Sequence, residues 1–449
     1  MFEFGRELRR MFARRPRAPG VLLGGEAGLH ELLDLQGLRG EARTAETGAA
    51  RVAGRDRARR QLAAARLWRE LARRSGDGEA LRKAAASAQA AAECWIQARR
   101  GPDWAWARLE QAMSAMLGLG VFGDGSLESA AETAAADVQR AGGGAAMIAR
   151  SLVAQLRARR AIQAGGPVDV RAAARAFNDP LAFLESAGRR DSRLRRAAVE
   201  ARIARSELLV GAGQRLNDED LLRAGVGDLT AAQGQLAALG EPLSSARVAV
   251  EKAAAMAALG ETTGDLSRLA RCVGALTKTM DALTREQSPL DWARGQIALA
   301  RALAALGEAT ENETALHKAL DCYDRAGHAL GAAPGLLLRA EAANGRGRTL
   351  ARLAELTGDV KVLDAAEAAF KAELVAQRRP EPVAWAMLQV QLGQVYATRL
   401  ALRGRDCGER AAAAFAFQAA LEVFAEQGLR SLAAIASEGL ERLAGASVG

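Results

Sequence analysis

Aromatic residues are scarce in this chain of 449 residues, where Phe, Trp and Tyr together make up 4%. Sheets and cores of large rings use many more of them, so the scarcity argues against a β architecture and favours helices packed through Ala and Leu. Glycine and proline number 46 and 10, far below the roughly one quarter of residues that marks low-complexity disorder. The chain is therefore expected to fold, and to fold into helices.

Metal-ligand clusters and disulfide patterns are also missing. The four cysteines contain no C-x-x-C, and the three histidines form no group with metal-ligand spacing. These residues are Cys94, Cys272, Cys322, Cys407, His30, His317 and His328. No run reaches the roughly 18 apolar residues of a transmembrane helix, and the first twenty residues lack the apolar region of a signal peptide. We therefore predict reduced thiols, no metal or other cofactor, and a cytoplasmic location.

Lysine is rare, because only six of the 62 basic residues are lysine and the rest are arginine. The formal net charge is +9, and the arginines are spread along the chain among 53 acidic residues. A nucleic-acid surface needs a continuous positive stripe, whereas the densest run, at 51–60, is short. We interpret this run as a solvated helix start, with a polyanion contact as the alternative. The sequence thus predicts no nucleic-acid partner.

Residues 1–20 combine an apolar stripe with a local excess of arginine, the pattern of a basic amphipathic helix. The apolar positions are Phe4, Leu8, Met11 and Phe12, and the basic positions include Arg9 and Arg10. Two hypotheses follow for this segment. The helix docks on the rest of the chain or on a partner protein, or residues 1–15 bind a membrane surface as a peripheral anchor.

Asp or Asn recurs at intervals of 47 residues. The dipeptide Gly-Asp begins at 76, 123, 264 and 358, and a fifth copy at 227 is out of register. With the intervening steps included, and only the step at 171 missing, the series is Asp77, Asp124, Asp218, Asp265, Asn312, Asp359 and Asp406. A side-chain oxygen placed just before an apolar-periodic run predicts an N-cap. Each of these residues is therefore expected to start the second helix of a repeat.

A first helix is expected ahead of each capped helix. Two of these helices begin with related segments, PLDWA at Pro289–Ala293 and PVAWA at Pro382–Ala386, and proline suits a first turn. Gly260 and Gly307 lie 47 residues apart and are predicted to close their helices in the left-handed conformation. The pattern predicts eight helix pairs, which start near 55, 102, 145, 192, 242, 289, 334 and 382.

The repeats divide the chain into four parts. Residues 1–20 form the amphipathic helix, and 21–54 form a leader segment. The array occupies 55–425 and is degenerate around 145–192. Residues 426–449 contain a final helix, which covers the exposed end of the array as stacked repeats require for solubility.

The array resembles the tetratricopeptide repeat, whose signature includes L-G-x2-Y and A-x3-F. The matching segments are Leu392-Gly393-x2-Tyr396, Ala413-x3-Phe417, Ala319-x3-Tyr323 and Ala366-x3-Phe370. The period of 47 exceeds the roughly 34 residues of that repeat, so its helices are expected to be longer. The resemblance to bacterial arrays of this kind implies an all-α, right-handed α-solenoid that binds a protein or peptide in a concave groove and catalyses no reaction.

One segment has the letters of a dinucleotide fingerprint. Gly118–Gly123 reads G-x-G-x-x-G, but such a site needs a preceding strand, and here a helix precedes it. We interpret the segment as a loop and predict no cofactor and no enzymatic activity.

The first helices of the C-terminal units supply the candidate binding residues. Taking Ala300, Gly347 and Gly393 as equivalent positions, the side chains expected to face the groove are Arg294, Arg301, Asn344, Arg348, Arg352, Gln394 and Thr398. Arginine binds carboxylates through two parallel hydrogen bonds, and amide side chains bond peptide backbones. The predicted partner is a protein or peptide with an acidic or C-terminal segment.

Overall fold

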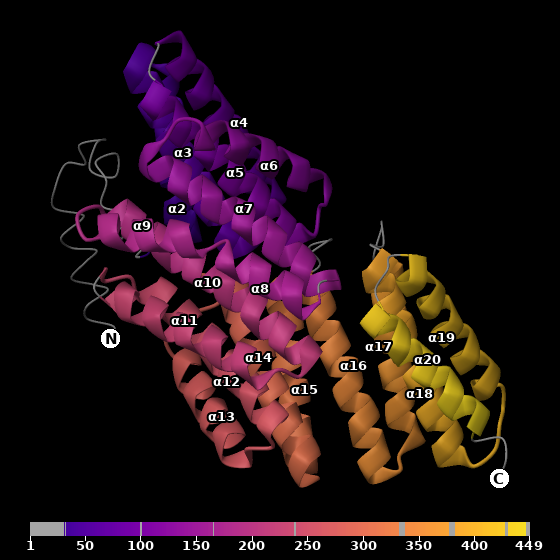
Figure 1. Cartoon of the computed structure of the whole chain (residues 1–449). Helices are drawn as coiled ribbons and strands as arrows, with labels where there is room; N and C mark the ends of the chain where they lie inside the picture. The colour runs from indigo at the N-terminus through magenta and orange to yellow at the C-terminus, as the bar shows by residue number, and fades with distance from the viewer. Residues whose placement is uncertain are drawn as a thin grey trace.

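The computed structural model is a stack of helices (Figure 1) that describes residues 31, 33–98, 101–164, 166–237, 239–331, 337–376, 382–426 and 430–445. Within these residues the regular secondary structure is helical, with no strand, and consecutive helices pack against one another along the chain except for the short helices α8 and α9, which both pack on α7 and α10. The prediction of an all-α solenoid of helix-turn-helix repeats is confirmed.

Each unit contains a first and a second helix. The first helices are α3 (Gly54–Ser75), α5 (Gly101–Phe122), α7 (Gly143–Ala164), α10 (Ser192–Leu216), α12 (Pro242–Thr263), α14 (Pro289–Thr310), α16 (Leu337–Thr357) and α18 (Pro382–Arg403). The second helices are α4 (Gly78–Gln97), α6 (Ser126–Gln139), α11 (Glu219–Ala237), α13 (Leu266–Met280), α15 (Glu313–Leu330), α17 (Val360–Ala376) and α19 (Glu409–Glu426). In the third unit two short helices, α8 (Pro167–Arg175) and α9 (Asn178–Gly188), replace the second helix. Helix α2 (Leu35–Ala50) precedes the units and α20 (Arg430–Gly445) follows them.

The recurring Asp and Asn residues begin the second helices as predicted. The Asp77 carboxylate accepts hydrogen bonds from the backbone N–H groups of Glu79 and Ala80, at 2.9 and 3.1 Å. The other six residues of the series accept equivalent backbone bonds. These bonds satisfy amides of the first turn that have no partner within the helix. The constant spacing of 47 residues thus has a local physical cause.

The predicted helix ends at Gly260 and Gly307 are wrong. Both helices close four residues later, at the left-handed residues Gly264 (φ 66°) and Glu311 (φ 50°). Gly307 instead allows close packing, because a Cβ there would lie 2.8 Å from Leu316 Cδ2. The repeated glycine therefore marks a helix contact and not a helix end.

In the last two units an aromatic side chain of the second helix packs onto a glycine of the first helix of the same unit. Phe370 lies against Gly347, and Phe417 lies against Gly393. A Cβ at Gly347 would overlap the Phe370 ring. The large ring fills the space left by the missing side chain, so the two helices of the unit pack closely together.

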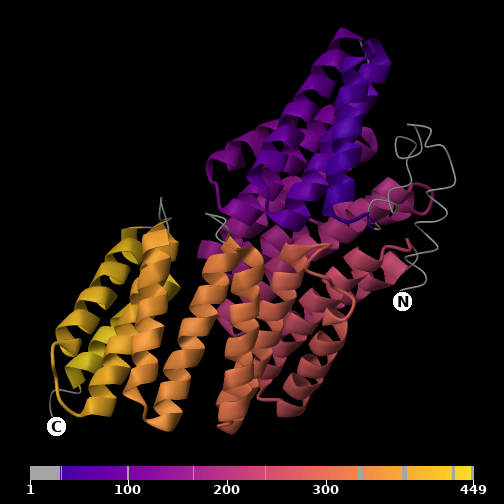
Figure 2. The ribbon, with the colours of Figure 1, turned by 180° about the vertical axis from the view of Figure 1, so that it is seen from behind.

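The array turns back on itself. Helix α3 contacts α14, and α5 contacts α16, although each pair lies far apart in the sequence. From behind, the indigo N-terminal helices meet the orange helices α14 and α16 (Figure 2). Two regions of the inner face result: the N-terminal helices contact α14 and one part of α16, whereas another part of α16 and α18 flank an open pocket.

Candidate functional site

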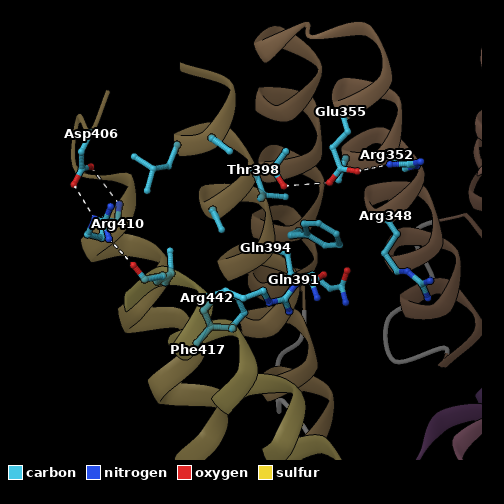
Figure 3. A pocket seen from close by; sticks show the side chains of 18 of the residues that line it. Arg348, Arg352, Glu355, Gln391, Gln394, Thr398, Asp406, Arg410, Phe417 and Arg442 are labelled. Atoms are coloured by element: carbon cyan, nitrogen blue, oxygen red, sulfur yellow. Dashed lines mark hydrogen bonds and ion pairs between the residues drawn. The ribbon is translucent and has the colours of Figure 1, made fainter. Parts of the chain in front are cut away.

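The open region contains a cavity of about 680 Å³ between α16, α18, α19 and α20 (Figure 3), which we call the C-terminal pocket. Helices α16 and α18 are successive first helices and form two of its walls. Helix α20 folds back against α18 and α19 and contributes Gly439, Arg442 and Leu443. The final helix is therefore a wall of the pocket as well as the last element of the stack.

One aromatic ring joins the three C-terminal helices. Phe417 of α19 is buried between two glycines, Gly393 of α18 and Gly439 of α20. Any side chain at either glycine would press on the ring, because an added Cβ would lie 2.8 and 2.7 Å from it. Phe417 and Phe370 both line the pocket, so its base is apolar and rigidly packed.

The pocket carries an excess of positive charge. Its lining includes five arginines and three carboxylates: Arg348, Arg352, Arg405, Arg410, Arg442, Glu308, Glu355 and Asp406. Arg352 pairs with Glu355 at 2.8 Å, and this hydrogen bond raises the pKa of the Arg352 guanidinium. Arg410 lies 3.9 Å from Asp406. These two arginines are already neutralised by the chain itself.

Arg348 and Arg405 differ from the other arginines. Both are exposed, and neither forms an ion pair or a side-chain hydrogen bond with any part of the chain that the structure describes. The amides of Gln391 and Gln394 also line the pocket and form no hydrogen bond with the described residues. The pocket thus presents two guanidinium groups and two side-chain amides that remain available to a ligand.

Four of the seven predicted groove residues lie together in this pocket. Arg348, Arg352, Gln394 and Thr398 line it. The Thr398 hydroxyl donates a hydrogen bond to Glu355 at 3.4 Å, which links α18 to α16 (Figure 3). The spacing of 47 residues therefore places equivalent positions of successive first helices side by side.

The other three predicted residues lie outside the pocket. Arg301 pairs with Glu341 at 3.0 Å. Arg294 lies 3.6 Å from both Glu251 and Asp291. The amide oxygen of Asn344 is buried and has no hydrogen-bond partner among the described residues. Arg294 and Arg301 of α14 are thus engaged in contacts within the chain, and a binding role for the predicted groove residues stays a prediction.

The residues of the predicted docking or membrane helix lie outside the described residues, and their role stays a prediction. They are Phe4, Leu8, Met11, Phe12, Arg9 and Arg10. Among the helices that the structure describes, none has the length and apolarity needed to cross a membrane. The described residues also contain no group of side chains suited to hold a metal ion.

Sequence reasoning missed several residues of the pocket. Gln391 lies on α18 one turn before Gln394, so helical spacing from a predicted residue was a sufficient signal. Arg405 and Arg410 belong to the loop and helix start after α18, and Arg442 belongs to α20. Their positions depend on how the final helix folds back, which no periodicity in the sequence encodes.

A second group of charges lies on the inner face of α10, α12 and α14. Burial, together with the nearby Glu251 carboxylate, raises the pKa of Glu207 to about 7, and Arg294 and Arg247 oppose this rise. Water still reaches the Glu207 side chain. The carboxylate is therefore surrounded by protein but not sealed from solvent, and it changes charge near neutral pH.

Comparisons with solved structures find similarity to helical repeat proteins. No family model matches the sequence, and no curated protein matches it. One similar structure is a Signal Transduction ATPase with Numerous Domains protein with a tetratricopeptide repeat sensor from Pyrococcus horikoshii, at 13% identity and a TM-score of 0.48. The match covers 91% of this chain and 55% of that one, so this chain spans about half of that protein's length.

Two further structures are similar at lower scores. Yeast Tom70 matches at 10% identity and a TM-score of 0.28, over 90% of this chain and 96% of Tom70. A circular tandem repeat protein matches at 17% identity and a TM-score of 0.19, over 93% of this chain and 89% of its own. Scores this low support no inference about function, so the functional argument depends on the geometry of the site.

Proposed function

We propose that the protein is a non-enzymatic interaction scaffold that binds an acidic peptide segment of a partner protein in the C-terminal pocket. The observation that carries this proposal is the pair of uncommitted arginines, Arg348 and Arg405, in a pocket with an apolar base. A ligand carboxylate at either arginine would gain charge-assisted hydrogen bonds, each contributing about 1.5–3 kcal/mol.

The remaining polar groups of the pocket suit a peptide backbone. Gln391 and Gln394 offer both amide donors and carbonyl acceptors at the same wall. Ala397, Leu400 and Ala401 provide accessible apolar surface for a side chain of the ligand. A peptide that combines carboxylates with an apolar residue would therefore use all three kinds of group.

The other parts of the structure support a scaffold in a reducing compartment. Cys94, Cys272, Cys322 and Cys407 are all free thiols, and Cys272 and Cys322 are buried. Disulfides are rare in the cytoplasm, so free thiols are consistent with a cytoplasmic location.

A selection from a display library of short random peptides, performed on the purified full chain, tests the ligand class directly. We expect acidic sequences with at least one apolar residue to be enriched. Fluorescence anisotropy on the enriched peptides then compares wild type with Arg348→Glu plus Arg405→Glu. Charge reversal should weaken binding at least about tenfold, because each arginine loses an attraction and gains a repulsion.

Arg325→Glu is the matched control, because Arg325 is an exposed arginine of α15 that does not line the pocket. It makes the same kind of charge reversal as each of the two substitutions, in the same half of the molecule, and should leave affinity nearly unchanged. Enrichment of neutral or basic peptides would contradict the proposed ligand. Equal affinity of the double variant and wild type would contradict the proposed site.

A further inference from the structure

The N-terminal limb, by which we mean Glu31 and helices α2 to α6, lies against the inner face of the array at α14, α16 and the first turn of α12. Two separate polar contacts hold the limb there, one from Arg73 of α3 and one from Glu31, which precedes α2. Neither contact involves the C-terminal pocket. Both contacts are polar, whereas successive units of the array pack through apolar side chains.

The first contact is an ion pair across the turned-back array. Arg73 Nη1 donates to Asp291 Oδ2 at 2.9 Å, and only 1% of the Asp291 side chain is exposed. The Ser288 hydroxyl donates to the same carboxylate oxygen at 2.6 Å. Burial opposes ionisation of Asp291, but Arg73, Arg247 and Arg294 outweigh it and lower its pKa. Asp291 is therefore charged when the limb is in place.

The second contact completes a helix start from a distant part of the chain. The Glu31 carboxylate accepts hydrogen bonds from the backbone N–H groups of Leu243 and Ser244, at 3.1 and 3.3 Å. The N-cap residue of α12, Glu241, makes no such bond itself. Gln287 donates a further bond to the Glu31 backbone oxygen at 2.7 Å. The first turn of α12 thus depends on a residue 212 positions earlier.

The contact between the limb and the inner face is more polar than contacts between successive units. Successive units share continuous apolar clusters, for example the cluster that joins α12 to α16. The limb adds only the end of α5 to that cluster, through Val121 and Phe122. A polar interface with a small apolar part resembles the interfaces across which domains move relative to one another. The third unit, with two short helices in place of one, lies between the limb and the covered face.

We propose that the N-terminal limb is an intramolecular cover that opens as one body and thereby exposes this part of the inner face, at α14, α16 and the first turn of α12. In the open state Asp291, Gln287 and the first turn of α12 become accessible to a partner. The closed state is then autoinhibited at this surface, while the C-terminal pocket stays open in both states. The inference concerns a different surface from the proposed peptide site and does not depend on it.

Hydrogen exchange of the full chain, followed by mass spectrometry, tests whether the two contacts open together. The amides of Leu243 and Ser244 report the Glu31 contact, whereas Arg73 belongs to the other contact. Arg73→Glu places a third carboxylate beside Asp291 and Glu70 and should release the limb. We expect exchange at Leu243 and Ser244 to rise about tenfold in this variant, because local opening controls exchange of protected amides.

Two further variants keep the test decisive. Arg73→Gln removes the charge without repulsion and should raise the same exchange by a smaller factor. Arg82→Glu changes an exposed arginine on α4 of the same limb and should leave it unchanged. The amides of Leu388 and Val390, buried in α18, report global unfolding and should stay protected in all three. Small-angle scattering should show a larger radius of gyration for Arg73→Glu alone.

The possible results separate cleanly. A rise at Leu243 and Ser244 with α18 still protected supports opening of the limb as one body. Wild-type exchange at these amides in both Arg73 variants would show that the two contacts are independent, and the proposal would be wrong. Loss of α18 protection together with that of α12 would show that the limb cannot leave without unfolding the array, which also overturns it.

Discussion

Helices α14 and α18 begin with related segments but face different surroundings. In PLDWA the third residue is Asp291, which receives Arg73 from the N-terminal limb. In PVAWA the corresponding residue is Ala384, which cannot form an ion pair. Helix α14 is covered by α3, whereas α18 lines the C-terminal pocket. A single position thus distinguishes the closed region of the inner face from the open one.

The comparison shows which features the units share and which they do not. Caps and glycine contacts recur in both regions, because every unit needs them to form and stack. The charged residues of the inner face do not recur, because each faces a different neighbour. The following predictions test this division, beginning with the largest expected effect.

Asp291→Asn should lower the free energy of unfolding more than any other change proposed below. The change keeps the shape of the side chain but removes one of the two carboxylates that pair with Arg73, so that only Glu70 remains. Loss of a charged partner in a buried contact typically costs about 3 kcal/mol. Urea unfolding monitored by circular dichroism measures the loss. Glu341→Gln is the control in the open region, where the Arg301–Glu341 pair is 56% and 40% exposed and should contribute less than about 1 kcal/mol. Equal losses would mean that the closed contact is no stronger than a surface pair.

Gly347→Ala should destabilise the open region by about 2 kcal/mol, because the new methyl group overpacks the contact with the Phe370 ring. Hydrogen exchange should show that α16 to α18 lose protection while α3 and α4 keep it. Gly274→Ala on α13 is the control, since a Cβ there meets no atom within 4 Å. That change should stabilise the protein by about 0.5–1 kcal/mol through helix propensity. Destabilisation by both changes would refute the packing explanation.

Asn312→Ala should cost about 1 kcal/mol, because the Ala315 amide loses the cap that it bonds at 3.1 Å. Asn312→Asp retains an acceptor and should unfold close to wild type in the same thermal melt. Asp359→Ala, which removes the cap of α17 in the open region, should cost a similar amount, because the caps are common to both regions. A much larger loss at one of the two would mean that the cap has a further role there.

Glu207→Gln should have the smallest effect, and it should depend on pH. A folded pKa of about 7 lies above the ordinary value, so the fold disfavours the charged form. The cost to the free energy of folding is absent at a pH below the pKa of Glu207 in the unfolded chain, and it grows as the pH rises to about 7. The variant should therefore melt at a higher temperature than wild type at pH 8 and at the same temperature at pH 4. A difference independent of pH would exclude this carboxylate as its cause.

The features that the sequence predicts well are local. An Asp or Asn cap contacts amides two to four residues away, so its position could be located from a constant spacing alone. The first helices begin within three residues of the predicted starts for the same reason. Four groove residues, Arg348, Arg352, Gln394 and Thr398, share the pocket because they occupy related positions of adjacent first helices.

The features that the sequence does not predict depend on contacts between residues far apart in the chain. Arg73 and Asp291 are 218 residues apart, and nothing in either unit indicates that they meet. The place of Arg294 in that cluster, away from the pocket, follows from the same closure. Arg442 enters the pocket because α20 folds back onto α18. A repeated pattern specifies each unit and its neighbour, whereas closure depends on how small rotations accumulate over many units.

The position of α20 bears on how separate molecules behave at high concentration. Gly439 occupies the site beside Phe417 that the first helix of another unit would need for stacking. A second molecule that approaches this face finds the ring already enclosed, so it gains no aromatic contact from joining head to tail. Filament growth through this face is thereby disfavoured. Removing α20 would expose the apolar surface around Phe417, through which molecules could join head to tail.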